Sequence, residues 1–174
     1  MEGLIKSGAK FKGRFDFEVY DKAGGKLISK TYAENIITDE GLNRILNVML
    51  NGATQTATWY CEIYETNTAG AANMTYDVPV YTICAAYAEA ARPAYVEAAS
   101  TAKSTTNSAN KAVFTMNATK TIYGAALVSL STKDDHTAGA NNVLLCAGLF
   151  ATAQPVISGN VVNLTYTITA ADAA

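Results

Sequence analysis

The sequence predicts a mainly β protein, an antiparallel β-sandwich with one amphipathic helix inserted at about residues 38–50. Several segments alternate apolar and polar residues with the period of two that is typical of half-buried strands. Turn-forming residues separate these segments, as expected for an antiparallel sandwich or barrel. At 174 residues, and without a change of composition that would mark a linker, the chain is predicted to form a single domain over residues 1–174, with residues 1–10 as an N-terminal arm.

The strands are predicted from alternation, apolar runs and the turns between them. In order, the predicted strands are 11–20, 26–32, 36–37, 58–64, 80–84, 95–97, 112–118, 121–130, 143–150 and 161–169. Segment 121–130 is apolar on both faces, which predicts a central strand. Gln154-Pro155 is expected to end the strand before it. Residues 85–92 favour a helix by propensity, but Pro93 follows directly and makes so short a helix marginal.

The one predicted helix is expected to bury an apolar stripe. Thr38 is its expected N-cap, and Gly52 can close its C-terminal end. The stripe is expected to pack on the apolar face of the next strand, which also carries Cys61. The predicted core of this helix-and-strand unit consists of Leu42, Ile45, Leu46, Met49, Trp59 and Ile63.

The composition predicts a neutral surface that favours assembly. Charged residues make up 16% of the chain, below the roughly 25% of typical soluble domains. Few charges then keep copies of the chain apart, although an ordinary secreted or alanine-rich bacterial domain has a similar composition. The net charge of −2 gives no long-range attraction to phosphate, so no nucleic-acid partner is expected. A basic cluster is limited to Lys6, Lys10, Lys12 and Arg14.

The three cysteines are Cys61, Cys84 and Cys146, an odd number without a CxxC pair. This pattern indicates neither a disulfide framework nor a zinc site, and each cysteine lies in an apolar run that suits a small buried side chain. A reducing cytoplasmic compartment is the simplest interpretation. No segment has the apolar length that crosses a membrane, so no membrane partner is expected.

The residues needed for an enzyme are scarce. His136, the only histidine, follows Asp134 and Asp135 in a polar loop, which is read as a solvated loop in preference to a metal site. No Gly-x-Ser-x-Gly motif accompanies it. Glu62 is expected to face solvent or a neighbouring subunit, because it alternates with the apolar residues of its strand. The sequence therefore predicts no enzyme, no metal and no cofactor.

The chain is rich in tyrosine, with ten tyrosines against five phenylalanines. Tyrosine suits interfaces because it is large, stiff and able to hydrogen-bond at one end, but tyrosines can equally line the edges of a sandwich. The candidate interface residues are Lys6, Lys10, Lys12, Arg14, Tyr60, Tyr64, Tyr76 and Tyr81.

Three stretches carry a family resemblance. They are Asn35–Asn43 (NIITDEGLN) continuing into residues 52–60, the segment 87–109 with Arg92-Pro93, and Phe114–Ala125 (FTMNATKTIYGA) with the strand 159–168. On these stretches the chain resembles small virion structural proteins of tailed bacteriophages. The resemblance implies a virion component made in the cytoplasm of the bacterial host.

The resemblance implies a capsid decoration or cement protein, a class that is often jelly-roll-like and trimeric. The implied partners are further copies of the chain, as a homotrimer, and the major capsid protein. A tail, neck or head-fibre component is the alternative within this class. A carbohydrate- or host-surface-binding module is the alternative of another class, because exposed aromatic rings on a sandwich can stack on sugars. Burial of Trp59 would favour the structural interpretation.

Overall fold

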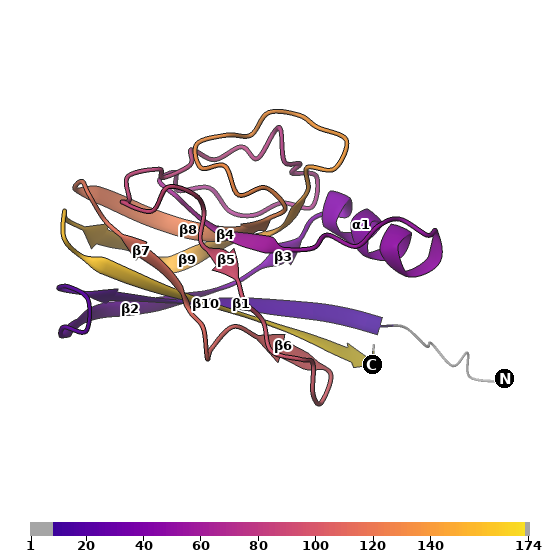
Figure 1. The fold of residues 1–174 in the computed structure, drawn as a ribbon, viewed down its shortest axis with the longest axis horizontal. Helices are drawn as coiled ribbons and strands as arrows, with labels where there is room; N and C mark the ends of the chain where they lie inside the picture. The colour runs from indigo at the N-terminus through magenta and orange to yellow at the C-terminus, as the bar shows by residue number, and fades with distance from the viewer. Residues whose placement is uncertain (1–8, 173–174) are drawn as a thin grey trace, which may run out of the picture.

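The fold is described from a computed structural model, which describes residues 9–172. Two antiparallel sheets face each other, and one helix lies at an end of the molecule (Figure 1). The elements are β1 (Ala9–Tyr20), β2 (Leu27–Glu34), β3 (Ile36–Ile37), α1 (Asp39–Leu50), β4 (Trp59–Tyr64), β5 (Ala94–Tyr95), β6 (Ser104–Thr106), β7 (Ala112–Thr115), β8 (Lys120–Val128), β9 (Leu144–Val156) and β10 (Val161–Asp172).

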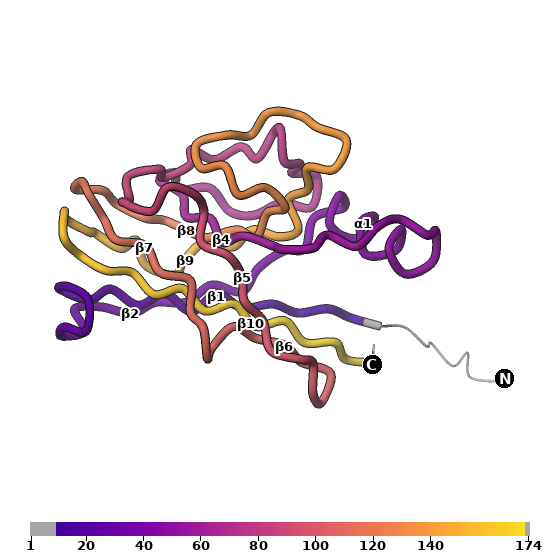
Figure 2. Tube along the Cα trace, viewed as in Figure 1, coloured from indigo at the N-terminus to yellow at the C-terminus, as the bar shows by residue number. Residues whose placement is uncertain are grey.

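The first sheet has the order β2-β1-β10-β6, and β7 also pairs with β10. Its centre is the long pairing of β1 with β10, which runs without a break from Ala9 opposite Asp172 to Tyr20 opposite Val161. The trace in Figure 2 shows these two strands, from opposite ends of the sequence, lying side by side along the length of the molecule. The two ends of the described chain are therefore neighbours.

The second sheet has the order β3-β9-β8-β4-β5. The chain enters it directly from the first sheet, because β2 ends at Glu34 and β3 begins at Ile36. Asn35 marks this change of sheet, and its backbone N–H still donates to the carbonyl of Gly13 on β1 at 3.0 Å. As predicted, β8 is an interior strand, with β9 on one side and β4 on the other.

The second sheet is covered on both faces. Its inner face packs on the first sheet around a core that includes Phe15, Phe17, Ile63, Phe114, Leu127, Cys146, Phe150, Leu164 and Tyr166. On its outer face, the loops between β4 and β5 and between β8 and β9 lie over the strands (Figure 1). A second buried cluster forms there from Tyr64, Met74, Tyr76, Tyr81, Ala126, Val128, Leu144 and Ala147.

The predicted β-sandwich with one inserted helix is confirmed, whereas the jelly-roll topology is not. The predicted strand at 80–84 is wrong, since only Ile83 forms an isolated bridge, with Tyr64. The expectation that Gln154-Pro155 ends a strand is also wrong, since β9 continues to Val156. At Pro155 only β8 pairs with β9, because the pairing with β3 is limited to Cys146 and Ala147, and proline is tolerated where one side of a strand is unpaired. No helix within residues 9–172 combines the length and the apolar character needed to cross a membrane.

The predicted helix ends are also confirmed. The Thr38 hydroxyl accepts a hydrogen bond from the Gly41 N–H at 2.9 Å and donates to the Leu144 carbonyl at 2.5 Å. At the other end Asn51 is the C-cap, and Gly52 follows in the left-handed region with φ of 64°. The N-cap residue Thr38 therefore closes the first turn of α1 and also attaches the start of the helix to β9.

The predicted burial of the helix stripe is wrong for three of its four residues. Leu42, Leu46 and Met49 are 39%, 52% and 70% exposed. The helix docks instead through Gly41, where a Cβ atom would overlap the backbone oxygen of Leu145 on β9. Because Gly41 lies against β9, the side of the helix that carries Gly41 faces the core. Ile45, one turn further on the same side, is therefore the partly buried residue of α1 that packs against the core. In the following strand Ile63 is buried and Trp59 is partly buried against the core, as predicted.

We predict that Gly41→Ala destabilises the chain by roughly 1–3 kcal/mol, because the new methyl group pushes α1 away from β9. In an exposed helix the same substitution would be favourable, because alanine has the higher helix propensity. Urea denaturation measures the difference. The matched control is Asn43→Ala on the exposed side of α1, which should leave stability unchanged or slightly higher. Equal stability of the two variants would contradict the close packing of Gly41.

Candidate functional site

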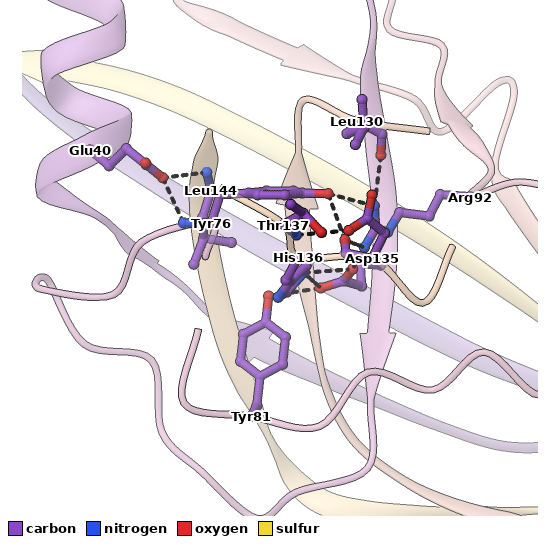
Figure 3. A network of polar contacts seen from close by, with 10 residues as sticks. Glu40, Tyr76, Tyr81, Arg92, Leu130, Asp135, His136, Thr137 and Leu144 are labelled. Atoms are coloured by element: carbon purple, nitrogen blue, oxygen red, sulfur yellow. Dashed lines mark hydrogen bonds and ion pairs between the residues drawn. The ribbon is translucent and has the colours of Figure 1, made fainter. Parts of the chain in front are cut away.

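The chemically most distinctive feature is a buried polar cluster on the outer face of the second sheet (Figure 3). We define it by Glu62, Tyr76, Tyr81, Arg92 and His136. Glu62 comes from β4, whereas the two tyrosines and Arg92 come from the segment between β4 and β5. His136 comes from the loop between β8 and β9. Three segments that are distant in sequence therefore meet at one carboxylate.

Glu62 accepts every interaction at the centre of this cluster. Arg92 Nη2 lies 2.5 Å from Glu62 Oε2, and the Tyr81 hydroxyl donates to Oε1 at 2.8 Å. His136 Nε2 lies 3.1 Å from both carboxylate oxygens. The expectation that Glu62 faces solvent or a neighbouring subunit is therefore wrong. Its side chain does point away from Cys61 and Ile63, as alternation requires, but the loops cover that face as well.

Arg92 ties both covering loops together. Its Nη1 donates to the Leu130 carbonyl at 2.9 Å and to the Tyr76 hydroxyl at 3.2 Å, while Nη2 also donates to the Asp135 carbonyl at 2.8 Å. Burial works against the charged form, but the Glu62 carboxylate and the Tyr76 hydroxyl outweigh it, so the pKa of Arg92 is raised. The guanidinium thus stays charged inside the protein.

The loop that carries His136 is held from its backbone. The Asp135 carbonyl accepts from the Tyr76 hydroxyl at 2.6 Å as well as from Arg92. The Asp135 carboxylate accepts from the Thr137 N–H at 2.7 Å, and hydrogen bonding by Thr137 lowers the pKa of Asp135. Asp135 and His136 therefore face different partners instead of converging. Across residues 9–172, no three His, Cys, Asp or Glu side chains are grouped so as to hold a metal ion.

A second carboxylate, Glu40 in the first turn of α1, repeats this pattern beside the cluster (Figure 3). Its Oε2 accepts from the backbone N–H of Tyr76 at 2.9 Å and from that of Leu144 at 2.6 Å. Glu40 thus joins the start of the helix to the loop after β4 and to β9. The two carboxylates bind five groups, which come from the segment between β4 and β5, the loop between β8 and β9, and the start of β9, and hold them in one arrangement.

The charged centre of the cluster is enclosed by the protein. Glu62 and the Arg92 side chain are almost completely buried, and the carboxylate is shared among three donors. A depression beside the cluster, with a volume of about 420 Å³, is lined by Glu40, Tyr76, Asp77, Ala138, Gly139, Ala140 and Asn142. Neither Glu62 nor His136 is part of that lining. The arrangement can therefore anchor loops, and Tyr76 is the one residue of the cluster that lines this depression.

The predicted interface residues are divided between surface and interior. Lys6 lies outside the described residues, while Lys10, Lys12 and Arg14 are exposed on β1, so Lys10 belongs to a strand and not to an arm. Arg14 is paired with Asp16 at 2.6 Å. Lys10 and Lys12 are therefore available at the surface for contact with a partner.

The tyrosine part of the prediction is wrong for Tyr64, Tyr76 and Tyr81. Tyr64, Tyr76 and Tyr81 are buried, and Tyr60 is partly buried against the outer cluster. The hydroxyls of the three buried tyrosines bind inside the chain: Tyr64 donates to the Thr68 carbonyl at 3.2 Å, and those of Tyr76 and Tyr81 bind in the polar cluster. The second covered face of the sheet is the physical reason, since it turns strand residues that would be exposed in a simple sandwich into core.

Sequence reasoning missed Arg92 and Glu40 as structural residues. A signal for the polar cluster exists in hindsight, since Glu62 is the one charged residue in the apolar strand Trp59–Tyr64. A charge inside such a strand requires a partner if both faces are buried. Nothing local to Arg92 indicates that it is this partner.

Comparison of the sequence with protein-family models finds no matching family, and comparison with curated proteins finds no matching relative.

We predict that Glu62→Gln lowers the free energy of unfolding by roughly 3–5 kcal/mol, because it leaves the buried Arg92 charge uncompensated. Urea denaturation followed by tryptophan fluorescence measures the loss. The matched control is Asp16→Asn, which breaks the exposed pair with Arg14 and should cost less than about 1 kcal/mol. Replacing both buried partners, Glu62→Leu with Arg92→Met, should recover part of the loss. Similar costs for Glu62→Gln and Asp16→Asn would contradict the anchoring role.

We predict that stability falls as the pH rises from about 9 to about 12. Burial raises the pKa of the Cys146 thiol from 9.0 to about 12 and that of the Tyr95 hydroxyl from 10.0 to about 12. Burial also places the pKa values of Tyr81 and Tyr166 well above 10.0. In this interval the unfolded chain releases protons that the folded chain keeps, so unfolding becomes more favourable with increasing pH.

Urea denaturation under reducing conditions, repeated from about pH 7 to about pH 11, tests this prediction. Tyr95→Phe keeps the ring but removes the ionisable hydroxyl, so its stability should decline less steeply above about pH 10. A free energy of unfolding that stays constant up to about pH 11 would show that these groups are not shielded from solvent.

Proposed function

We propose that this chain is a structural protein of a bacteriophage virion, and that it decorates the capsid and stabilises it through protein contacts. The resemblance of Asn35–Asn43 and Phe114–Ala125 to small virion proteins supports the class of particle. The proposal assigns no catalytic step to the chain. Its partners are further copies of itself and the major capsid protein.

The observation that carries the proposal is the exposed apolar surface of a protein with few charges. Charged residues are 16% of the chain, yet Leu46, Met49 and Leu50 of α1 are 52%, 70% and 79% exposed. Large apolar side chains gathered on a surface are typical of contact sites. Two of the exposed valines, Val78 and Val80, lie in a loop whose ends are held by the buried Tyr76 and Tyr81. A rigid body with apolar contact points suits a protein that adds many weak contacts to a shell.

The interior of the chain supports the same proposal. The polar cluster at Glu62 and the anchor at Glu40 hold the outer loops in a single arrangement. A decorating protein needs this rigidity because every copy has to match the same lattice. The partial burial of Trp59 against the core weakens the carbohydrate-binding alternative, which requires an open aromatic face.

The proposal predicts that the chain is present in purified particles of the phage that encodes it. Mass spectrometry of the particles measures copy number relative to the major capsid protein. Immunogold electron microscopy with antibodies against the recombinant chain gives its position. We expect gold over the head, in many copies per particle, and particles lacking the gene should release DNA at a lower temperature.

Gold confined to the tail or neck would replace capsid decoration by the tail-associated alternative. A chain that stays in the cleared lysate and is absent from particles would contradict any virion role. The matched control is a phage lacking the gene and complemented in trans, which should restore both the gold label and the thermal resistance.

A further inference from the structure

The exposed side of α1 consists of two ordered rows of side chains. Leu42, Leu46 and Leu50 follow one another at intervals of four residues, and so do Asn43, Asn47 and Asn51 beside them. Residues at this spacing form a continuous ridge along a helix, and such ridges are the elements that pack when two helices meet. The leucine row is exposed to 39%, 52% and 79% along its length.

Within residues 9–172, the chain itself does not cover this ridge. α1 docks through the adjacent row, in which Gly41 touches the backbone of Leu145 and Ile45 packs against the core. Figure 1 shows the helix at one end of the molecule, with its later turns directed away from both sheets. A second helix can therefore approach the leucine row without first displacing a sheet.

The absence of charge along the later turns of the ridge permits an identical partner. Residues 45–51 carry no charged side chain, so two copies meet there without like-charge repulsion. Arg44, the charge nearest the middle of α1, is turned to the following segment, where it donates to Thr54 and Thr56 at 2.8 and 3.1 Å. The asparagine row can both donate and accept hydrogen bonds, so it is complementary to a copy of itself.

We propose that α1 is a self-association surface, on which the leucine row of one copy packs antiparallel against that of a second copy about Leu46. In this register Leu46 faces Leu46 of the second copy, and Leu42 and Leu50 face each other at both ends of the contact. Antiparallel packing also opposes the two helix dipoles. The asparagine rows then flank the leucines on the rim.

The expected association is weak in solution. A helix of 12 residues is about 18 Å long. Two such helices therefore bury less than the roughly 1,200 Å² of a standard stable interface, which points to a dissociation constant in the micromolar-to-millimolar range. Weak pairing of this kind becomes effective when many copies are held close together. The inference stands on the surface of α1 and does not depend on the virion proposal.

Sedimentation equilibrium over a concentration series tests the pairing. We expect a monomer–dimer equilibrium whose dissociation constant rises at least about tenfold in Leu46→Glu, because two carboxylates then face each other in an apolar contact. The matched control is Ile28→Glu, which makes the same kind of change at a residue of similar exposure, 54%, on β2. It should leave the equilibrium unchanged. Circular dichroism and thermal unfolding verify that both variants are folded.

Cysteine crosslinking tests the register, since the chain's own three cysteines are buried. Under mild oxidation Leu46→Cys should form a disulfide-linked dimer. Asp39→Cys should not, because antiparallel packing about residue 46 separates the two copies of residue 39 by roughly 20 Å.

Each other outcome overturns the inference. A monomer at every concentration, or an oligomer that Leu46→Glu does not weaken, removes α1 as the contact. Dimers that crosslink through Asp39→Cys show a parallel arrangement instead. If the unaltered chain is monomeric and Leu46→Glu abolishes its incorporation into particles, the leucine row binds a different virion protein. Failure of the chain to enter particles at all contradicts the proposed function but leaves a dimer in solution intact.

Discussion

Glu62 places a carboxylate on the outer face of β4, which the loops above the second sheet cover, and these loops are organised around it. A buried carboxylate is strongly destabilising unless it is paired and hydrogen-bonded. Here Arg92, Tyr81 and His136 supply the donors, and each reaches Glu62 from a different part of the covering loops. Removing Arg92 would leave the buried carboxylate without its charge partner, and removing Tyr81 or His136 would leave it with fewer hydrogen bonds.

This constraint explains how a chain with few charges keeps long loops in order. The loops over the second sheet contain little regular structure, so backbone pairing alone does not hold them. The cluster at Glu62 and the anchor at Glu40 provide fixed points, and buried tyrosines fill the space between them. Within residues 9–172, Glu62 and Arg92 are the two charged residues that are buried, and their pairing orders the loops around them.

The neutral surface connects the two proposals. α1 is fixed at its start by Thr38, Gly41 and Glu40, and its remaining turns are left with exposed leucines. A helix that is secured at one end and apolar at the other can present a contact surface without loosening the fold. Assembly on a particle and pairing of two copies both use this property, but they are separate claims with separate outcomes.

The sequence by itself determined the local structure. Alternation of apolar residues located most strands, such as β1 and β10, and the cap residues Thr38 and Gly52 located the ends of the only helix within residues 9–172. These features depend on neighbouring residues, so a single sequence contains them. The buried position of Ile63 followed from the same periodicity.

Only the tertiary structure decided which faces were covered. Periodicity separates the apolar face of a strand or helix from its other face, but it does not show whether another part of the chain covers that other face. The contacts that decided this join residues 19 positions apart, as in Tyr81 and Glu62, or 74 positions apart, as in His136 and Glu62. They turned Tyr64, Tyr76 and Tyr81 from expected surface into core, and the close approach of Gly41 to Leu145 turned Leu42 and Leu46 from expected core into surface.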